Sequence, residues 1–585
     1  MLGSSALVLS LLALGIGPHV VFAGTPVRGR TSSYQRVGSA SQLPMSHFAP
    51  NTRCAEPPCS EQVHIQLGGP GEMVVVFASA PSTNTSARVT FGEVGAPSSK
   101  LTVAGTTATY SQLMYWSTNT WNPEMGLPTL TPEQVAAIRT TTSWAADSKS
   151  GLHGGAWANV SVDQVLEEGD QLGNYKNYLE NYNSPQLHTV VLRGLKGGQR
   201  YEYSVDRDDR VFSFVMPKDT FPFTFGLTAD VDQTEVTNAT FNALAAMAPG
   251  AVLLAGDLAY ANGYYPRWDS YAQLAEALST AVPIMTCPGN HETGFLEAFQ
   301  SYKARYPMPA AASGSTDPTY WSRDIGPAHV VSLNTYAGTN PSSAQYRWLE
   351  EDLATRFDRR RTPWLVVMMH APWYNSNTKH VRESEPMRGD MEALLYSFGA
   401  NIVLSGHVHS YERTAPMYNN ASDPCGATYL NLGDGGKGMA NVKWLPGESG
   451  APQPEWSLFR QASFGAGQLE LVNDTHAYFK WHRHSCYDED APLNENVNAS
   501  GCISTGDDSL QSTLVSDETW IVRPSAAQCE GQEQHEVRGM PKPAPSSFAS
   551  LVGLPSCGQD ELLNTTTGEC IVVRGQARRL ETNFV

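Results

Sequence analysis

The sequence predicts an α/β domain that is preceded by an all-β domain. The chain has 585 residues, which is too long for one compact core and requires at least two domains. Its first part contains short stretches in which apolar and polar residues alternate, whereas its middle part contains continuous apolar runs separated by helical patterns. These two patterns are typical of an antiparallel sandwich and of a sheet covered by helices, respectively.

The alternating stretches place the all-β domain at residues 55–217. Turns rich in Gly, Pro and Ser separate the stretches, which favours an antiparallel β-sandwich. Residues 100–187 are rich in Thr, Trp, Tyr and Asn and allow no assignment. The expected strands lie at residues 62–67, 73–77, 188–195, 201–205 and 211–215.

The continuous apolar runs place the α/β domain at residues 218–484. Helical patterns lie between the runs, and one of them has Ser342-Ser343 as a plausible cap and carries Trp348, Leu349, Leu353 and Phe357 on one face. The domain is therefore predicted to contain layered mixed sheets with flanking helices, an α+β sandwich. Its expected buried strands lie at residues 221–227, 251–255, 282–286, 364–369 and 401–404.

The two ends of the chain lie outside these domains. Residues 7–16 form an apolar run too short to span a bilayer, and Val21-Phe22-Ala23 is typical of a cleavage site. Residues 1–23 are therefore predicted to be a secretory signal peptide, followed by a leader at 24–54. Residues 485–585 form a polar, Cys-containing extension in which we identify no chemistry.

The cysteines and glycosylation sequons agree with export. The spacing of Cys54 and Cys59, and of Cys557 and Cys570, suits short disulfide loops, and Cys287 is the expected free thiol. We therefore expect a secreted, N-glycosylated protein of the extracellular space, a cell wall or a vacuole. The Asn-x-Ser/Thr sequons begin at Asn84, Asn159, Asn238, Asn420, Asn473, Asn498 and Asn564.

The formal net charge of −18 at pH 7 argues against several classes of partner. Duplex DNA, RNA and anionic membranes all select basic protein surfaces, so none of them is the expected main partner. A local basic pocket can still bind an anionic substrate, and the net charge therefore does not exclude a phosphate ligand.

A polar cluster directly follows each of the five apolar runs. Because the binding crevice of an open α/β sheet lies outside the carboxyl ends of its strands, we expect all five clusters to meet at a single edge. Together they offer three His, two Asp, one Asn and one Tyr, which exceeds the needs of one metal ion and suits two. The candidate ligands are Asp230, Asp257, Tyr260, Asn290, His370, His407 and His409.

Local features of these clusters also suit metal binding. The His407-x-His409 pattern places both imidazoles on one side of an extended segment. The glycines that precede Asp257, Asn290 and His407 let the backbone turn sharply where a strand becomes a ligand loop. Each cluster alone has an ordinary explanation, such as a cap or turn for Asp230. Unrelated turns have no reason to repeat at five successive strand ends, so the ordered set favours a two-metal site.

The same residues carry a resemblance to a known family. The series Asp230, Gly256-Asp257-x-x-Tyr260, Gly289-Asn290-His291-Glu292, His370 and Gly406-His407-x-His409 resembles the metallophosphoesterases, and specifically the purple acid phosphatases. Further similar motifs begin at His370, Gly433 and Trp456. The resemblance covers about residues 55–484 and is weak or absent at 100–187 and in the tail. It agrees with a fibronectin-III-like sandwich in front of the catalytic domain.

The resemblance implies an acid phosphatase with an Fe(III) ion and a divalent ion, which would be Zn, Mn or Fe(II). A metal-bound hydroxide would attack phosphorus in line, His291 would protonate the leaving alcohol, and His380 would lie in the substrate pocket. The Fe(III) ligands would be Asp230, Asp257, Tyr260 and His409, because carboxylate and phenolate suit a trivalent ion. Asp257 would bridge to the divalent ion, whose other ligands would be Asn290, His370 and His407.

Two residues depart from the family pattern. The first motif usually reads Asp-x-Gly, but the glycine position is Asp232, which changes the turn or adds negative charge near the site. Plant members often carry a histidine just before the position of His380, where this chain has Lys379, a point charge that can attract phosphate. Neither change removes a ligand, so both bear on substrate preference rather than on metal binding.

Other functions remain as alternatives. Gly433-x-Gly435-x-x-Gly438 fits a dinucleotide-binding fingerprint, but the following segment makes a poor helix, and such a site needs a helix N-terminus. A Mn- or Zn-dependent phosphodiesterase or nucleotidase would keep the two metals without iron, and Tyr260 argues against it. A non-catalytic surface protein disagrees with the complete ligand set. Phytate, nucleotides, phosphoproteins and small esters all remain open as substrates, and a homodimer remains open as well.

Overall fold

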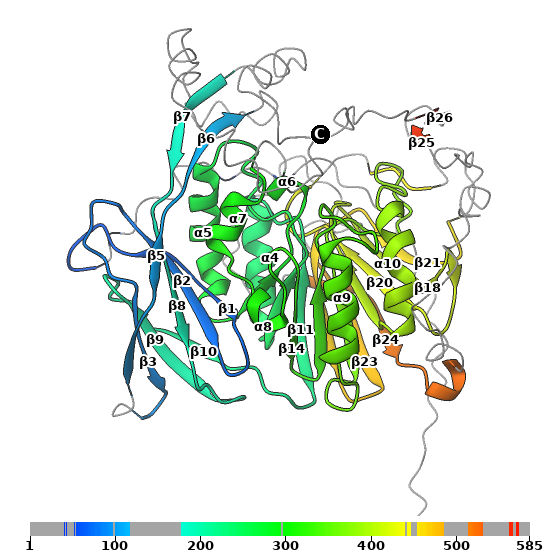
Figure 1. Cartoon of the computed structure of the whole chain (residues 1–585), viewed down its shortest axis with the longest axis horizontal. Helices are drawn as coiled ribbons and strands as arrows, with labels where there is room; N and C mark the ends of the chain where they lie inside the picture. Colours follow the sequence, from blue (N-terminus) through cyan, green and yellow to red (C-terminus); the bar gives the residue numbers. More distant parts are fainter. Residues whose placement is uncertain are drawn as a thin grey trace, which may run out of the picture.

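The computed structural model contains two four-stranded sheets, two larger sheets and flanking helices (Figure 1). The predicted signal peptide, nearly all of the predicted leader and most of the C-terminal extension lie outside the described residues. The structure describes residues 40, 43, 52, 54–96, 100–116, 177–293, 297–438, 442–445, 453–484, 513–529, 561–564 and 569–572.

The N-terminal part is built from the alternating stretches of the sequence. Its two antiparallel sheets have the orders β1-β2-β8-β5 and β10-β9-β3-β4. Side chains of both sheets, including Phe77 and Tyr203, enter one buried cluster. The fibronectin-III-like classification stays a prediction. The strands are β1 (Glu61–Leu67), β2 (Met73–Ser79), β3 (Arg88–Glu93), β4 (Leu101–Ala104), β5 (Thr106–Ala108), β8 (Gln186–Leu192), β9 (Arg200–Val205) and β10 (Phe212–Val215), with a separate antiparallel pair of β6 (Ser111–Trp116) and β7 (Asn177–Asn183).

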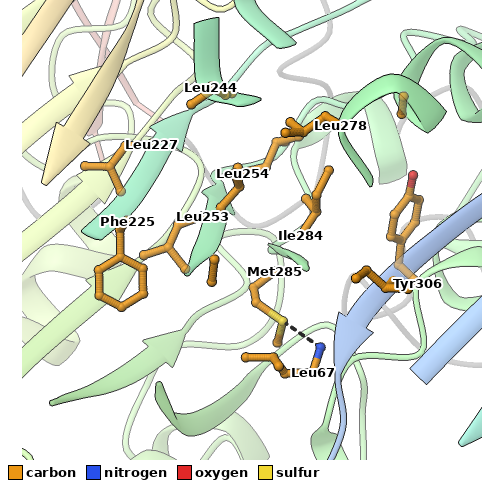
Figure 2. Packing of buried hydrophobic residues seen from close by; sticks show 14 of the residues in the cluster. Leu67, Phe225, Leu227, Leu244, Leu253, Leu254, Leu278, Ile284, Met285 and Tyr306 are labelled. Atoms are coloured by element: carbon orange, nitrogen blue, oxygen red, sulfur yellow. Dashed lines mark hydrogen bonds between the residues drawn. The ribbon is translucent and has the colours of Figure 1, made fainter. Parts of the chain in front are cut away.

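The first large sheet has six strands in the order β13-β12-β11-β22-β23-β24. The strands β11, β12 and β13 are parallel to one another, and β22, β23 and β24 add antiparallel neighbours. Leu254 of β12 points toward Leu244 and Leu278 of the covering helices, whereas Leu253 points the opposite way with Phe225 (Figure 2). The elements are β11 (Phe223–Thr228), α4 (Glu235–Ala246), β12 (Ala251–Leu254), α5 (Pro266–Ser279), β13 (Ile284–Thr286), β22 (Gly465–Leu471), β23 (His476–His484) and β24 (Thr513–Val522).

The second large sheet has eight strands in the order β14-β15-β16-β17-β20-β18-β19, with β21 paired to β18. Its central strands β15, β16, β17 and β20 are parallel. Ser343 caps α9 by accepting the backbone N–H of Tyr346, as its position in the sequence predicts. The elements are β14 (Trp321–Ile325), β15 (Ala328–Ser332), α9 (Ala344–Thr355), β16 (Trp364–Met368), α10 (Glu385–Ser397), β17 (Ile402–Ser405), β18 (Tyr411–Tyr418), β19 (Ala421–Ser422), β20 (Ala427–Leu432) and β21 (Ser457–Gln461).

The two large sheets pack face to face, with helices on the outside. Along β16, Val366 and Met368 share a buried cluster with Phe225 of the six-stranded sheet, whereas Leu365 and Val367 share a second cluster with α9 and α10. This alternation explains why the strand reads as a continuous apolar run, since both of its faces are buried. The mixed, layered α/β sandwich predicted from the sequence is confirmed, although the five apolar runs divide between two sheets instead of forming one edge.

The all-β part and the α/β part share one hydrophobic core. Figure 2 shows Leu67 of β1 beside Met285 of β13, and the backbone N–H of Leu67 donates to the Met285 sulfur at 3.3 Å. At the same junction the buried Arg305 donates to the side chains of Gln62 and Asp269, each at 2.7 Å. These contacts fix the position of the N-terminal sheets against α5 and β13.

The described part of the C-terminal extension completes the six-stranded sheet. Buried Asp517 of β24 accepts hydrogen bonds from Tyr411 Oη at 2.6 Å and from Arg413 at 2.7 and 2.9 Å, which joins the extension to β18. A disulfide between Cys425 and Cys529 is a second link between the extension and the α/β domain. The remaining short elements are α6 (Asn290–Thr293), α7 (Gln300–Arg305), α8 (Ala310–Ser313), η8 (Ala526–Cys529), β25 (Glu561–Asn564) and β26 (Glu569–Val572).

The cysteine predictions are partly confirmed. Cys54 and Cys59 form a disulfide, and Cys287 is a buried free thiol, as expected. The Cys425–Cys529 bridge is not apparent from sequence spacing, because it joins positions 104 residues apart. Cys557 lies outside the described residues, so its pairing with Cys570 stays a prediction. Among the described residues, no helix is long and apolar enough to cross a membrane.

A buried histidine on β15 of the eight-stranded sheet links stability to pH. Burial alone would lower the pKa of His329, but hydrogen bonds to Asp324 and Asp352 at 2.7 and 2.9 Å outweigh this effect and raise it to about 9. Protonated His329 therefore stabilises the fold. This stabilisation is complete below the ordinary pKa of 6.5 and disappears as the pH rises through about 9.

We expect His329→Gln to remove this part of the pH dependence of folding. The free energy of unfolding of the wild type should fall relative to the variant between about pH 6.5 and about pH 9, by at most about 3 kcal/mol. Urea denaturation across this range measures the difference. Ser322→Ala is the matched control, because it removes only a hydrogen bond to Asp352 and should keep the wild-type pH slope. Parallel curves for wild type and His329→Gln would contradict the expectation.

Candidate metal centre

The five polar clusters converge between the two large sheets. Three of them follow the parallel strands β11, β12 and β13 of the six-stranded sheet, and two follow β16 and β17 of the eight-stranded sheet. The carboxyl ends of both parallel sets therefore border one site. This arrangement brings together all seven candidate ligands, namely Asp230, Asp257, Tyr260, Asn290, His370, His407 and His409.

One group of candidate ligands gathers around Asp230. Oxygen or nitrogen atoms of Asp230, Asp257 and His409 lie within 4.8 Å of one another. The phenol oxygen of Tyr260 lies 2.9 Å from Asp230 Oδ1 and 3.0 Å from His409 Nε2. Two carboxylates, one phenol and one imidazole thus surround a single point.

The second group gathers around the amide oxygen of Asn290. This oxygen lies 3.1 Å from His370 Nε2 and 3.0 Å from His407 Nδ1. Asp257 joins this group too, because its Oδ2 lies 3.3 Å from His370 Nε2, and ligand atoms of Asp257, His370 and His407 lie within 4.8 Å of one another. Asp257 is therefore common to both groups, which is the position of a bridging carboxylate.

Hydrogen bonds outside the site fix the orientation of the imidazoles. His370 donates from Nδ1 to the backbone carbonyl of Ala255 at 2.7 Å, which leaves Nε2 to face the site. His407 has the opposite orientation: its Nε2 lies 3.0 Å from Glu383 Oε1 and its Nδ1 faces Asn290. Each ring thus turns its other nitrogen toward the other candidate ligands.

Several candidate ligands have an unusual backbone conformation. The φ angles of Asp230, Asp257, Tyr260 and His407 are 55°, 54°, 46° and 67°, in the left-handed region that residues other than glycine rarely adopt. Such conformations cost of order 1–3 kcal/mol each and persist where the surrounding structure requires them. Four strained residues among seven candidate ligands mark this site as functional.

The glycines beside the ligands are needed mainly for space. A Cβ atom at Gly289 would collide with the carboxylate of Asp257, and one at Gly406 would collide with that of Asp230. Gly256 has a positive φ of 87°, which glycine adopts without strain. Of the three glycines, only Gly256 therefore provides the sharp backbone turn that the sequence predicts. At the other two positions the side chain is missing because a carboxylate occupies its place.

The loops that carry these residues are held by buried carboxylates. Glu292 accepts the backbone N–H groups of Asp257, Leu258 and Gly289, at 2.9, 2.8 and 2.6 Å, and so joins two ligand loops. Buried Glu412 accepts from the backbone N–H and hydroxyl of Ser376, on the loop behind His370. These residues lie in the motifs that resemble the family, which gives those motifs a structural role.

The buried negative charge of the site suits a dinuclear metal centre. Asp230 and Asp257 are both fully buried, and Asp257 Oδ2 accepts no hydrogen bond from the residues that the structure describes. Burial would raise the pKa of both groups; it does so for Asp230, whereas the adjacent His370 and His291 hold the pKa of Asp257 below its usual value. Metal cations between these groups would balance the negative charge of the two carboxylates and would give Asp257 Oδ2 a partner. The residues therefore fit two metal ions.

The two candidate catalytic histidines lie on opposite sides of the ligand groups. The ring of His291 is tilted against that of Tyr260, with 4.2 Å between their centres, and its Nε2 lies 3.8 Å from Asp257 Oδ2. The ring of His380 lies 4.1 Å from that of His407, and its Nδ1 bonds Glu383 at 2.6 Å. Burial lowers the pKa of both histidines to about 4.

Sequence reasoning missed two side chains at the site. Glu383 contacts both His380 and His407, yet no motif marks it, because it lies on an irregular loop before α10. Glu292 was visible within the Gly-Asn-His-Glu motif, but its role required the three backbone contacts to be seen. Asp232, expected to change the turn or to add negative charge near the site, places a buried carboxylate there that forms ion pairs with Arg267 and Lys437, at 2.6 and 3.0 Å.

Comparison with known proteins agrees with this geometry. Residues 223–411 match the calcineurin-like phosphoesterase family, and residues 426–490 match the family described as iron/zinc purple acid phosphatase-like protein C. Purple acid phosphatase 18 of Arabidopsis thaliana is 39% identical over 345 residues, which is 57% of this chain and 77% of that protein. Purple acid phosphatase 22 of the same plant is 39% identical over 338 residues, 55% of this chain and 77% of that protein.

A solved structure supports the same fold. It is a purple acid phosphatase isolated from yellow lupin (Lupinus luteus) seeds, with a TM-score of 0.59 and 18% sequence identity, and the match covers 83% of this chain and 78% of that one. The curated relatives extend over three quarters of their own length at well above 30% identity. The chain therefore belongs to the purple acid phosphatase family and is a metal-dependent hydrolase of phosphate monoesters with a dinuclear metal centre.

Proposed function

We propose that this acid phosphatase uses an Fe(III) ion together with a divalent Zn, Mn or Fe ion. The observation that carries the proposal is the pair of ligand groups that share Asp257, with the phenol of Tyr260 in only one of them. Phenolate and carboxylate oxygens favour a trivalent ion, whereas imidazole and amide donors favour a divalent one. The Fe(III) ligands would be Asp230, Asp257, Tyr260 and His409, and the divalent ion would be held by Asp257, Asn290, His370 and His407.

The protein side chains then have distinct tasks. When bound, the two metals would supply a water of lowered pKa and positive charge for the phosphoryl group. His291 donates from Nδ1 to Asn262, so its Nε2 faces the site and is the atom placed to give a proton to the leaving oxygen. His380, oriented by Glu383, would contact the substrate phosphate from the other side. Lys379 precedes it on the same loop and adds positive charge.

We further propose that the protein is secreted and glycosylated and acts on small phosphate esters. Disulfides at Cys54–Cys59 and Cys425–Cys529 agree with an oxidising compartment. Among the described sequons, Asn84 and Asn473 are exposed and suit a glycan, whereas Asn420 is buried and does not. The net charge of −18 favours small substrates over nucleic acid or anionic membranes.

The iron assignment predicts a tyrosinate charge-transfer band in the visible spectrum of the purified protein. Tyr260→Phe should abolish the band, because it removes the phenolate donor. Tyr336→Phe is the matched control, since its hydroxyl lies 3.4 Å from Asn290 in the other ligand group, and it should keep the band. A colourless wild type that contains two metal ions and cleaves phosphate esters would instead support a Mn- or Zn-dependent enzyme.

The dinuclear arrangement predicts that one lost imidazole disables the site. We expect His407→Ala to lower kcat/KM by more than about 100-fold, since even partners outside the metal ligands cost 10–100-fold. The metal content should fall from two ions toward one per chain, as measured by elemental analysis. His476→Ala, on β23, serves as the control and should leave both values unchanged. Full activity in His407→Ala would remove this residue from the proposed ligands.

The role proposed for His291 predicts a dependence on the leaving group. His291→Gln should lower kcat for alkyl phosphates by about 100-fold or more, because an alkoxide needs a proton to depart. Aryl phosphates with acidic phenols should be much less affected, since their leaving groups depart as anions. His380→Gln, proposed to bind the phosphate, should affect both substrate types equally. Equal losses for both substrates in His291→Gln would argue against proton donation by this residue.

A further inference from the structure

Asp232 anchors a buried ion cluster beside the metal centre. Its Oδ1 accepts from Arg267 Nη2 at 2.6 Å and from the backbone N–H of Gln233 at 2.8 Å, and its Oδ2 accepts from Lys437 Nζ at 3.0 Å. The side chain of Asp232 is fully buried. One carboxylate with two cationic side chains gives this cluster a net charge of +1, whereas with a glycine at position 232 the net charge would be +2.

The backbone of Asp232 keeps the conformation that suits a glycine. Its φ of 56° lies in the left-handed region, so an aspartate at this position carries backbone strain that a glycine would not. Its carboxylate also needs two partners to be tolerated in a buried position. Asp232 is unfavourable for folding in both respects. We therefore expect it to have a function, which is to hold its two cationic partners in place.

Lys437 is the partner that reaches the metal centre. Its backbone N–H donates to the carbonyl of Asp230 at 2.7 Å, and its ammonium nitrogen lies 4.7 Å from the centre of the Tyr260 ring. This distance is within the range of a cation–π contact. The Asp232 carboxylate holds the ammonium in this place, because a lysine side chain alone has several free torsions.

We propose that Lys437, held by Asp232, is a positioning residue that weakens Tyr260 as an electron donor to the first metal. The inference rests on the proposed function, in which Tyr260 is a ligand of Fe(III). A positive charge over the ring stabilises the phenolate electrons, which are then given less readily to the metal.

The electronic consequence has a definite sign. Stabilising the phenolate electrons widens the gap to the empty metal orbitals, because the ammonium is in contact with the ring itself. Lys437 therefore moves the charge-transfer band to shorter wavelength. It also favours the reduced metal, since a positive charge nearby opposes an additional positive charge on the ion. Both effects are absent in a protein without a cation at position 437.

The test compares the visible spectrum and the reduction potential of the first metal in three proteins. Lys437→Met should move the band to longer wavelength and lower the potential, and Lys437→Arg, which keeps the cation over the ring, should restore both toward wild type. Lys437→Met leaves the pair of Asp232 and Arg267 intact, so the variant should fold.

The outcomes separate this inference from the proposed function. A purple wild type whose band and potential are unchanged in Lys437→Met overturns the inference alone. A colourless wild type overturns the iron assignment and the inference with it. Thermal denaturation of the metal-free proteins measures any loss of folding, and a band shift that Lys437→Arg fails to restore would show a structural effect and would also overturn the inference.

Discussion

The metal centre depends on the burial of two carboxylates, Asp230 and Asp257, where the two large sheets meet. Carboxylates without water cost several kcal/mol each unless cations and hydrogen-bond donors surround them. Much of the local structure serves this need. The glycines beside them clear space for their oxygens, and the backbone N–H groups of His291 and His407 donate to them. Five loops from two sheets converge because a single strand end cannot supply this many partners.

The catalytic fold and the candidate ligands were accessible from the sequence because both have local signatures. Strands buried on both faces read as unbroken apolar runs, and a ligand loop must begin where its strand ends, so each run pointed to its cluster. The prediction of a two-metal site depends on the ordered set of five clusters, because each cluster alone has an ordinary explanation. What the sequence could not provide was the division of β11–β13 and β15–β17 between two sheets, because strand pairing depends on contacts that periodicity does not contain.

The residues that escaped prediction act through distant partners. Glu383 supports His407 across 24 positions, Asp517 joins Tyr411 across 106, and Cys425 pairs with Cys529 across 104. Asp232 departs from the family pattern, and the sequence alone predicts only a changed turn or added negative charge at this position. The structure shows compensation by Arg267 and Lys437, which lie 35 and 205 positions away. Long-range polar contacts of this kind leave no repeat or spacing from which they could be read.

The position of β24 at the edge of the six-stranded sheet has a consequence for biosynthesis. Because this strand comes from residues 513–522, the sheet stays incomplete until residue 522 has left the ribosome. Until then β23 offers unpaired backbone groups along its entire length, a surface on which nascent chains can associate wrongly. The buried ion pair between Arg413 and Asp517 likewise cannot form until Asp517 has been synthesised. The catalytic core is therefore expected to reach its native state only after residues 513–522 have been synthesised, and until then it depends on protection of this edge.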